Sequence, residues 1–522
     1  MTTAVEDRVV RALGSISAAT LLSRVLGYVR DMLVALAFGA GPVTDAFLVA
    51  FRIPNILRRL LGEGALSTAI VPVFTDYHVN RSREEFVRMV RAVLAAALLV
   101  LTLVSALGVL AAPWILRAIA PGFVDDPAQA ALATLLTRVM FPYLLLVGLA
   151  ALAMGALNAE GRFFASALGP ALLNVGMIAG VLVLAPRLTP PILGLAFGVL
   201  LGGAAQLAVQ IPSLRRAGVL VSPSGELAHP ALRRVLHLLL PAVFGLAAAQ
   251  VSVFVNTLLA SLLPGGSISF LYYADRVMEF PLGVFGIALA AASLPSMARQ
   301  AAASDHPGLA GTLNFALRLS FHIALPATVG LILLRTPITR LLFERGRFGP
   351  EDTVATAQAL LWYAAGLAAF SGARIAAQTF YALGEPGTAV RLGIISVVAN
   401  VATAIALMRP MGHAALALAS SVGAFVNLIS LVWAARGRLG RIGGRALVAS
   451  VGRTTAASAP LALWCLAALT LWPAHPGRWR EAAWLAATIG GGAGVFWVAS
   501  RIVARPEHTA LVRILPGRKP VL

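Results

Sequence analysis

Long apolar runs alternate with short polar connections along this chain. An α-helix rises about 1.5 Å per residue, so about twenty consecutive apolar residues are needed to cross the hydrocarbon of a bilayer. The pattern therefore predicts an all-α polytopic membrane protein with about fourteen transmembrane helices. The second, eighth and tenth segments are long, and we expect them to tilt, bend or extend beyond the membrane. The predicted segments are 15–40, 44–77, 87–112, 131–156, 163–186, 191–212, 234–263, 267–298, 311–335, 354–383, 388–408, 412–435, 447–472 and 482–504.

The composition leads to the same class of protein. Hydrophobic residues make up 59% of the 522 residues, charged residues only 12%, and the mean hydropathy is +0.86. So few charges cannot cover the surface of a soluble protein of this length. Continuous apolar runs also exclude a membrane β-barrel, whose strands alternate polar and apolar residues.

The basic residues indicate how the chain is oriented. They gather in every second connection, and both ends of the chain fall on that basic side, so the positive-inside rule predicts cytoplasmic termini. The net charge of +20 then reflects orientation and contact with anionic membrane lipids rather than nucleic acid. The basic connections hold Arg81, Arg83, Arg88 and Arg91, then Arg215, Arg216, Arg233 and Arg234, then Arg436, Arg438, Arg441 and Arg445.

A weak internal repeat relates two parts of the chain. Each copy has a glycine, a mid-helix arginine, an Ala-Leu pair and a proline in the same order, offset by about 224 residues. Two parallel six-helix lobes are one architecture used for alternating access. We therefore expect an N-lobe at 1–225, a C-lobe at 226–440 and two added helices within 441–522. The copies run from Gly41 through Arg52 and Ala65 to Pro72, and from Gly265 through Arg276 and Ala288 to Pro295.

Charged residues inside the first, second and eighth segments are the main anomaly. A charge at mid-helix costs roughly 2.5–3.5 kcal/mol on insertion scales, so such residues usually face a water-filled cavity. We predict that these three segments line a shared, water-filled cationic cavity, to which Arg24, Arg58 and Arg276 contribute. Because guanidinium groups bind phosphate in a bidentate manner, the expected substrate is a lipid with a phosphorylated headgroup.

Two other interpretations of these charges remain open. Arg30–Asp31 and Asp275–Arg276 are neighbours that could neutralise each other or hold helix ends. Arg52 could extend its charged end to the membrane interface instead of lining a cavity.

Motifs for enzymatic chemistry are missing from the sequence. The only lysine is Lys519, so a Walker A motif is impossible, and the eight histidines form neither an H-E-x-x-H motif nor a metal-ligand cluster. We therefore expect a protein that is not an enzyme and that needs no metal and no cofactor.

A series of short motifs resembles the MurJ/MviN family of lipid II flippases. The motifs appear in the family's order and spacing over most of the chain, and most weakly after about residue 445. They are Ser23–Asp31 (SRVLGYVRD), Phe38–Gly41 (FGAG), Thr44–Phe47 (TDAF), Pro54–Arg59 (PNILRR), Glu63–Ala65 (EGA), Ala120–Phe123 (APGF), Tyr272–Arg276 (YYADR) and Met278–Pro281 (MEFP).

The resemblance implies a member of the MOP exporter superfamily in the cell inner membrane. Such a protein moves lipid II, the undecaprenyl-pyrophosphate-linked precursor of peptidoglycan, to the periplasmic leaflet during cell wall biogenesis, and peptidoglycan-synthesis machinery is a possible partner. Its last two helices form a groove for the lipid tail. Family cavity residues correspond here to Arg24, Arg30, Arg58 and Arg276, with Asp31, Asp45, Asn55, Ser269 and Glu279 as weaker correspondences. Segments seven, eleven and twelve hold no acidic residue, which argues against the sodium site of some members.

Three rival functions remain at this stage. A related exporter would move another polyprenyl-linked oligosaccharide or a drug, although an arginine-rich cavity disfavours cationic drugs. A membrane enzyme acting on polyprenyl phosphates would need a carboxylate or histidine cluster, for which Glu344, Glu351 and Asp352 are the sole candidates. A scaffold for envelope assembly would leave the intramembrane arginines without a purpose.

Overall fold

The computed structural model describes residues 2–58, 65–162, 164–219, 221–472 and 477–514. The chain divides into two compact units, residues 1–266 and 267–522, which are considered one at a time. Helices account for nearly all of the described residues, and no strand occurs among them. The predicted all-α fold class is confirmed.

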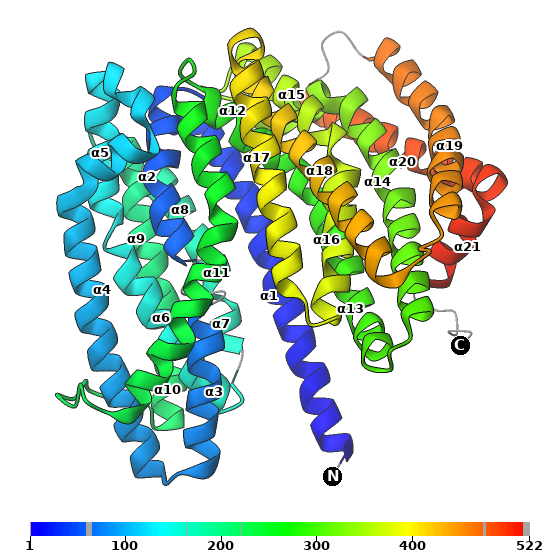
Figure 1. The fold of residues 1–522 in the computed structure, drawn as a ribbon. Coiled ribbons are helices and arrows are strands. Elements are labelled where there is room, and N and C mark those ends of the chain that lie inside the picture. Colours follow the sequence, from blue (N-terminus) through cyan, green and yellow to red (C-terminus); the bar gives the residue numbers. More distant parts are fainter. Residues whose placement is uncertain (1, 59–64, 163, 220, 473–476, 515–522) are drawn as a thin grey trace. The chain divides into compact units, whose positions relative to one another are not determined.

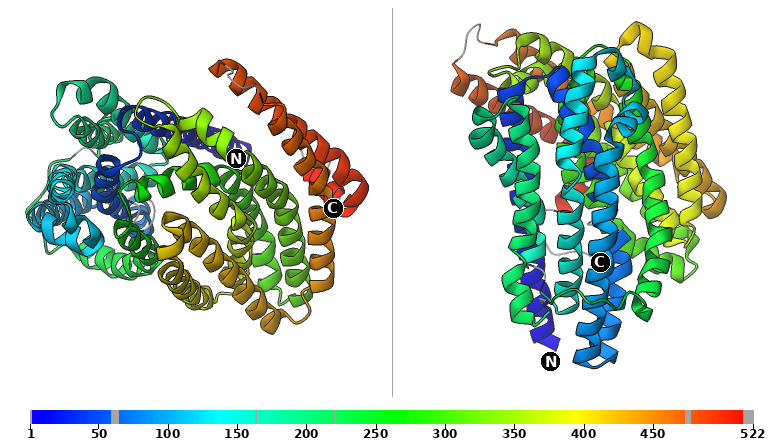
Figure 2. Two further views of the ribbon diagram at one scale, coloured as in Figure 1. Left: turned by 90° about the horizontal axis from the view of Figure 1, so that it is seen from above. Right: turned by 90° about the vertical axis from the view of Figure 1, so that its left-hand side faces the viewer.

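The helices of the first unit run up and down beside one another (Figures 1 and 2). They are α1 (Thr2–Phe38), α2 (Pro42–Arg58), α3 (Ala65–Asn80), α4 (Arg83–Ile119), α5 (Pro127–Met140), α6 (Tyr143–Ala159), α7 (Phe164–Ala167), α8 (Gly169–Ala179), α9 (Ile192–Ala208), α10 (Ile211–Ala217) and α11 (Pro230–Ser261). Short turns of other helix types are η2 (Pro121–Asp125), η3 (Gly180–Leu184) and η4 (Ala185–Arg187).

Prolines mark most of the breaks in these helices. α5 passes into α6 next to Pro142, and α10 has a proline in its first turn. Proline lacks the N–H that would continue the helical hydrogen bonds, so a helix tends to end or restart there. Pro54 is an exception, because α2 continues through it to Arg58. Residues 59–64, which include Arg59 and Glu63, lie outside the described residues.

Glycines bring α8 and η3 against α9. A Cβ placed on Gly198 would lie 2.7 Å from the Gly176 carbonyl oxygen and 2.9 Å from the Met177 Cα, and one on Gly194 would lie 2.3 Å from the Ala185 nitrogen. The two backbones are therefore in direct contact. Small residues make this approach possible, as is common where membrane helices pack.

The second unit is a bundle of longer helices. It contains α12 (Ser267–Pro281), η5 (Leu282–Gly286), α13 (Ile287–Ala302), α14 (His306–Phe343), α15 (Pro350–Ala365), α16 (Leu367–Ala382), α17 (Pro386–Met411), α18 (His413–Leu439), α19 (Gly444–Thr470), α20 (Arg478–Val503) and α21 (Arg505–Ile514). α14 packs against α15, α16 and α19, and α19 also packs against α20. A core of Leu334, Ala457, Leu461, Cys465 and Leu485 fills the space beside α19.

Each of the fourteen predicted segments is a helix or an interrupted run of helices. By length and composition, eight runs within the described residues could cross a membrane, and a ninth would do so if the bent pair α15 and α16 forms one span. The second, eighth and tenth segments contain α2 and α3, α12 with η5 and α13, and α15 with α16. The last pair is bent by 42°, as predicted for a long segment. α11 packs against α3 and α4 of the first unit. The division into lobes at residue 225 stays a prediction.

Candidate functional site

Arg30 and Asp31 form a buried ion pair on α1. The Arg30 Nη2 lies 2.6 Å from the Asp31 Oδ1, and both side chains are more than nine-tenths buried. Arg30 also donates to the Asn174 Oδ1 of α8 at 2.9 Å, and Asn174 donates in turn to the Ser23 carbonyl oxygen at 2.9 Å. The pair thus holds α1 against α8. The interpretation of a neutralising pair, which the sequence left open, is supported by this geometry.

Asp45 lies in the first turn of α2 and is 2% exposed. Its Oδ2 accepts a hydrogen bond of 2.6 Å from the backbone N–H of Gly266. Thr44 beside it donates to the Gly39 carbonyl oxygen at 2.9 Å. Asp45 therefore joins the start of α2 to the connection that follows α11, which is a structural contact between the two loops that the internal repeat aligns.

Arg58 and Arg24 are the more accessible bases of the first unit. Arg58 is half-buried in the last turn of α2, and its Nε donates to the Asn55 Oδ1 at 3.2 Å. Arg24 is exposed on α1, where no hydrogen bond or ion pair joins it to the described residues. Both guanidinium groups are more exposed than that of Arg30.

The second unit contributes Arg276 of α12. Its Nη1 lies 2.9 Å from the Oε2 of Glu279, one helical turn further on. Its guanidinium lies 5.3 Å from the centre of the Tyr272 ring, close enough for a cation–π contact. Glu279 is exposed, and Ser269 on the same helix is fully buried.

Arg374 of α16 is a charged residue that the sequence analysis missed. It interacts electrostatically with Glu279 and Asp275 of α12. It therefore belongs to the same group of charges as Arg276. Its position inside the apolar run 354–383 was the signal that could have found it, since a charge within a membrane helix is expensive.

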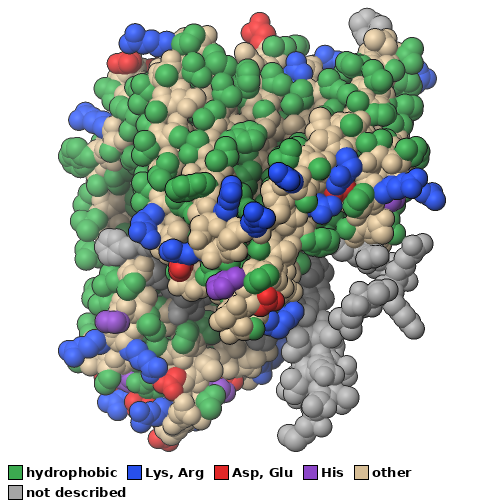
Figure 3. All heavy atoms as spheres, turned by 45° about the vertical axis from the view of Figure 1, so that its right-hand side comes forward, with side chains coloured by type: hydrophobic (Ala, Val, Ile, Leu, Met, Phe, Trp, Pro, Cys, Tyr) green, Lys and Arg blue, Asp and Glu red, His purple; other side chains and the backbone are tan. Residues whose placement is uncertain are grey.

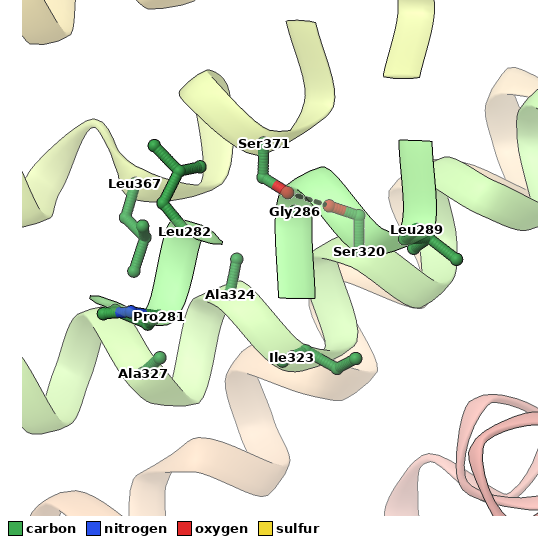
Figure 4. A pocket seen from close by; sticks show the side chains of 10 residues that line it. All are labelled: Pro281, Leu282, Gly286, Leu289, Ser320, Ile323, Ala324, Ala327, Leu367 and Ser371. Atoms are coloured by element: carbon green, nitrogen blue, oxygen red, sulfur yellow. Dashed lines mark hydrogen bonds between the residues drawn. The ribbon is translucent and has the colours of Figure 1, made fainter. Parts of the chain in front are cut away.

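α12 is joined to α13 by the turn η5, in which five residues are wound as a π-helix after Pro281. Figure 4 shows Ser320 of α14 and Ser371 of α16 pointing toward each other beside this turn, with their hydroxyl oxygens 2.6 Å apart. The cavity between them measures about 10 Å³, which is about the space of one water molecule. A Cβ on Gly286 would lie only 2.8 Å from the Ser371 hydroxyl oxygen.

A second cluster of charges, also missed from the sequence, holds α21 in place. Glu507 is 2% exposed, and its carboxylate accepts hydrogen bonds from Arg318 of α14 at 2.5 Å and from Arg453 of α19 at 2.7 Å. His508 lies 2.9 Å from the Ser500 hydroxyl of α20. Burial raises the pKa of Glu507, but hydrogen bonds from Arg453 and Arg318 outweigh it and lower the pKa to about 2.

We expect Glu507→Gln to lower the free energy of unfolding by about 1.5–3 kcal/mol, because hydrogen bonds to a charged group are lost. The folded-state pKa lies below the usual value, so this contribution is present above about pH 4.5 and disappears as the pH falls toward 2. Thermal unfolding of both proteins between pH 7 and pH 3 measures the difference. If wild type and Glu507→Gln differed in stability by the same amount at pH 7 and at pH 3, this prediction would be contradicted.

Taken together, the structure groups Arg30, Asp31 and Asn174 in the first unit, and Arg276, Glu279 and Arg374 in the second. On the face in Figure 3, hydrophobic side chains cover much of the surface between separate groups of charged ones. No group of three or more metal-ligating residues occurs in the described part of the chain. Helices long and apolar enough to span a bilayer define a polytopic membrane protein. The buried charges on α1 and the charges shared by α12 and α16 are of the kind found in membrane transporters.

Comparison with known proteins specifies this class. The family "Lipid II flippase MurJ" matches residues 34–481. A probable lipid II flippase MurJ from Vibrio cholerae is 39% identical over 80% of this chain and 81% of its own length. The lipid II flippase MurJ from Burkholderia cenocepacia is 38% identical over 82% of this chain and 84% of its own length. The chain belongs to the MurJ family.

Solved structures show the same fold. A lipid II flippase MurJ in an inward closed conformation superimposes with a TM-score of 0.78 and 24% identity, over 94% of this chain and 99% of the other. An inward-facing MATE multidrug transporter of the MOP superfamily has a TM-score of 0.62 and 19% identity, over 83% of this chain and 99% of the other. The predicted family is confirmed.

Proposed function

We propose that this chain flips lipid II across the cell inner membrane for peptidoglycan biosynthesis, by alternating access. It is a transporter and not an enzyme. The observation that carries the proposal is the family match over residues 34–481, together with relatives of that name that are aligned over about four-fifths of both lengths. The intramembrane arginines supply the chemistry that a pyrophosphate headgroup requires.

Among the predicted site residues we assign direct headgroup contact to Arg24, Arg58 and Arg276. Arg24 is exposed, and Arg58 and Arg276 are half-buried, so each guanidinium retains surface for an anion. We give Arg30 and Asp31 a positioning role. Their ion pair and the contact with Asn174 determine which face of α1 packs against α8. Asn55 and Glu279 orient Arg58 and Arg276 through their hydrogen bonds, while Asp45 and Ser269 support the starts of α2 and α12.

We place both termini in the cytoplasm, because the connections on that side carry most of the arginines. These connections would also face the anionic lipids of the inner leaflet. The helices beyond residue 440 are proposed to hold the lipid tail, and peptidoglycan-synthesis proteins are the expected partners.

The direct test of this function is complementation. Cells whose own lipid II flippase can be depleted would express this chain, and lipid II in each leaflet would be measured after depletion. We expect lipid II to reach the periplasmic leaflet and the cells to keep their shape. Accumulation of lipid II in the cytoplasmic leaflet, despite normal amounts of the chain in the membrane, would reject the proposal.

Alternating access also needs a hinge, and we assign it to Pro281 and the turn η5. We expect Gly286→Ala to slow flipping roughly tenfold, because the new methyl would meet the Ser371 hydroxyl at 2.8 Å and force the turn to shift. The added variant Ser371→Ala removes that oxygen and should restore most of the rate. Gly311→Ala on α14, where nothing lies within 4 Å, is the matched control. A Gly286→Ala protein with unchanged flipping would disprove the hinge.

A further inference from the structure

We propose that the first unit contains a binding site for one acyl chain of a membrane phospholipid, at a place distinct from the arginines assigned to transport. The site is a cavity of about 240 Å³ lined by Ala, Val, Leu, Ile and Phe side chains only. They come from α3, α4, α6, α9 and α10 and from the connection after α10 (Figure 1).

The chemistry of the lining selects a hydrocarbon. A buried water needs two to four polar partners, and no side chain that lines this cavity offers one. An engineered apolar cavity of about 150 Å³ stays dry and binds benzene or xenon, so a larger one can accept a longer apolar group. Each methylene transferred from water would gain about 0.8 kcal/mol, but a chain that already lies in the bilayer gains mainly from close packing.

Part of the lining comes from α4, a helix with a large exposed apolar surface. Val93 and Leu152 of the lining are buried, whereas Leu94 and Leu98 of α4 are half-buried. Leu103, which lies further along α4, is 56% exposed, and only 17% of the most apolar window of α4 is buried. The apolar groups that reach such a surface in a membrane are lipid chains.

The rim of the cavity carries a cation that suits a phosphate. Arg91 of α4 is exposed, and its Nε donates to the Ser222 carbonyl oxygen at 3.2 Å, beside the lining residue Val221. Among the described residues Arg91 forms no ion pair, whereas its neighbour Arg88 is paired with Glu226 at 2.7 Å. The Arg91–Ser222 hydrogen bond and the Arg88–Glu226 ion pair hold the connection after α10 against α4, beside the cavity. Charge at the rim and hydrocarbon inside match a phospholipid better than an uncharged apolar molecule.

The test is photolabelling of the full chain in lipid nanodiscs. The probe is a phosphatidylglycerol, whose headgroup is anionic, with a diazirine near the end of one acyl chain, and the labelled residues are mapped by mass spectrometry. We expect labels on α4 and α6 residues that line the cavity. Ala153→Phe should fill the cavity, and Val221→Glu should repel the phosphate at its mouth. Each should reduce this labelling at least fivefold, while Leu103→Phe, on the exposed face of α4, should leave it unchanged.

Two results would overturn the proposal. One is equal labelling of the cavity residues in the wild type and in both variants, with size-exclusion chromatography and thermal unfolding showing that all are folded. The other is loss of the label when undecaprenyl phosphate is added in excess, because the occupant would then be a polyprenyl chain. Flipping is measured in parallel, and its failure in the wild type would concern the proposed function and not this site.

Discussion

Arg276→Ala is expected to abolish lipid II flipping while the protein still accumulates in the membrane. Arg276 offers a planar, half-buried guanidinium on α12, beside Glu279 and Tyr272. Loss of two charge-assisted hydrogen bonds to a pyrophosphate removes about 3–5 kcal/mol of binding, which corresponds to a decrease of at least about 100-fold. The leaflet assay on depleted cells measures this directly.

Two further variants separate charge from geometry. Arg276→Lys keeps the positive charge but loses the planar guanidinium that binds phosphate in a bidentate manner. We therefore expect partial flipping activity, well below that of the wild type. Arg436→Ala removes an exposed arginine of α18 that lies outside the proposed site, and it should flip normally. Normal flipping by both Arg276→Ala and Arg24→Ala would refute the assignment of these residues to the headgroup.

Gly198→Val is expected to prevent stable packing of α9 against α8 and η3. The added carbons would overlap the Gly176 carbonyl oxygen at 2.7 Å and the Met177 Cα at 2.9 Å, and backbone atoms cannot turn aside as a flexible side chain can. Overpacking usually costs about 1–3 kcal/mol, and a clash with backbone should reach the upper end or exceed it. The amount of folded protein and its melting temperature in detergent measure the effect.

Gly393→Val is the matched control for this change. Gly393 also lies inside a helix, α17, but nothing lies within 4 Å of the position that its Cβ would take. We expect little loss of stability there. If the two variants melted at the same temperature, the close contact of α8 and α9 would not be important for the fold.

The sequence predicted the helical segments well, because the spacing of apolar runs depends only on the thickness of the bilayer. It placed the interruptions less well. For example, α5 and α6 separate at Phe141 and Pro142 within a segment that reads as one apolar run, whereas α2 continues through Pro54. A proline in a membrane helix can be accommodated by its neighbours, so its effect depends on packing.

For the charged residues, too, the sequence predicted one property and packing decided another. Arg24, Arg30, Arg58 and Arg276 could be selected from the sequence because charges in apolar segments are rare and costly. Which of them is buried and hydrogen-bonded and which is exposed could not be predicted. Arg30 donates a hydrogen bond to Asn174, which is 144 residues away, whereas Arg24 is exposed. The contacts of Arg374 and of the Glu507 cluster could not be predicted either, since their partners lie on other helices.

The sequence by itself determined that this protein is a helical membrane protein with arginines in its spans, and its motifs identified the MurJ family. Those properties are local, because they depend on hydropathy, charge and the order of short motifs. Only the tertiary structure decided which arginine is paired, where α8 and α9 touch, and that an apolar cavity lies beside α4. Each of these depends on distances between segments far apart in the chain, which packing alone sets.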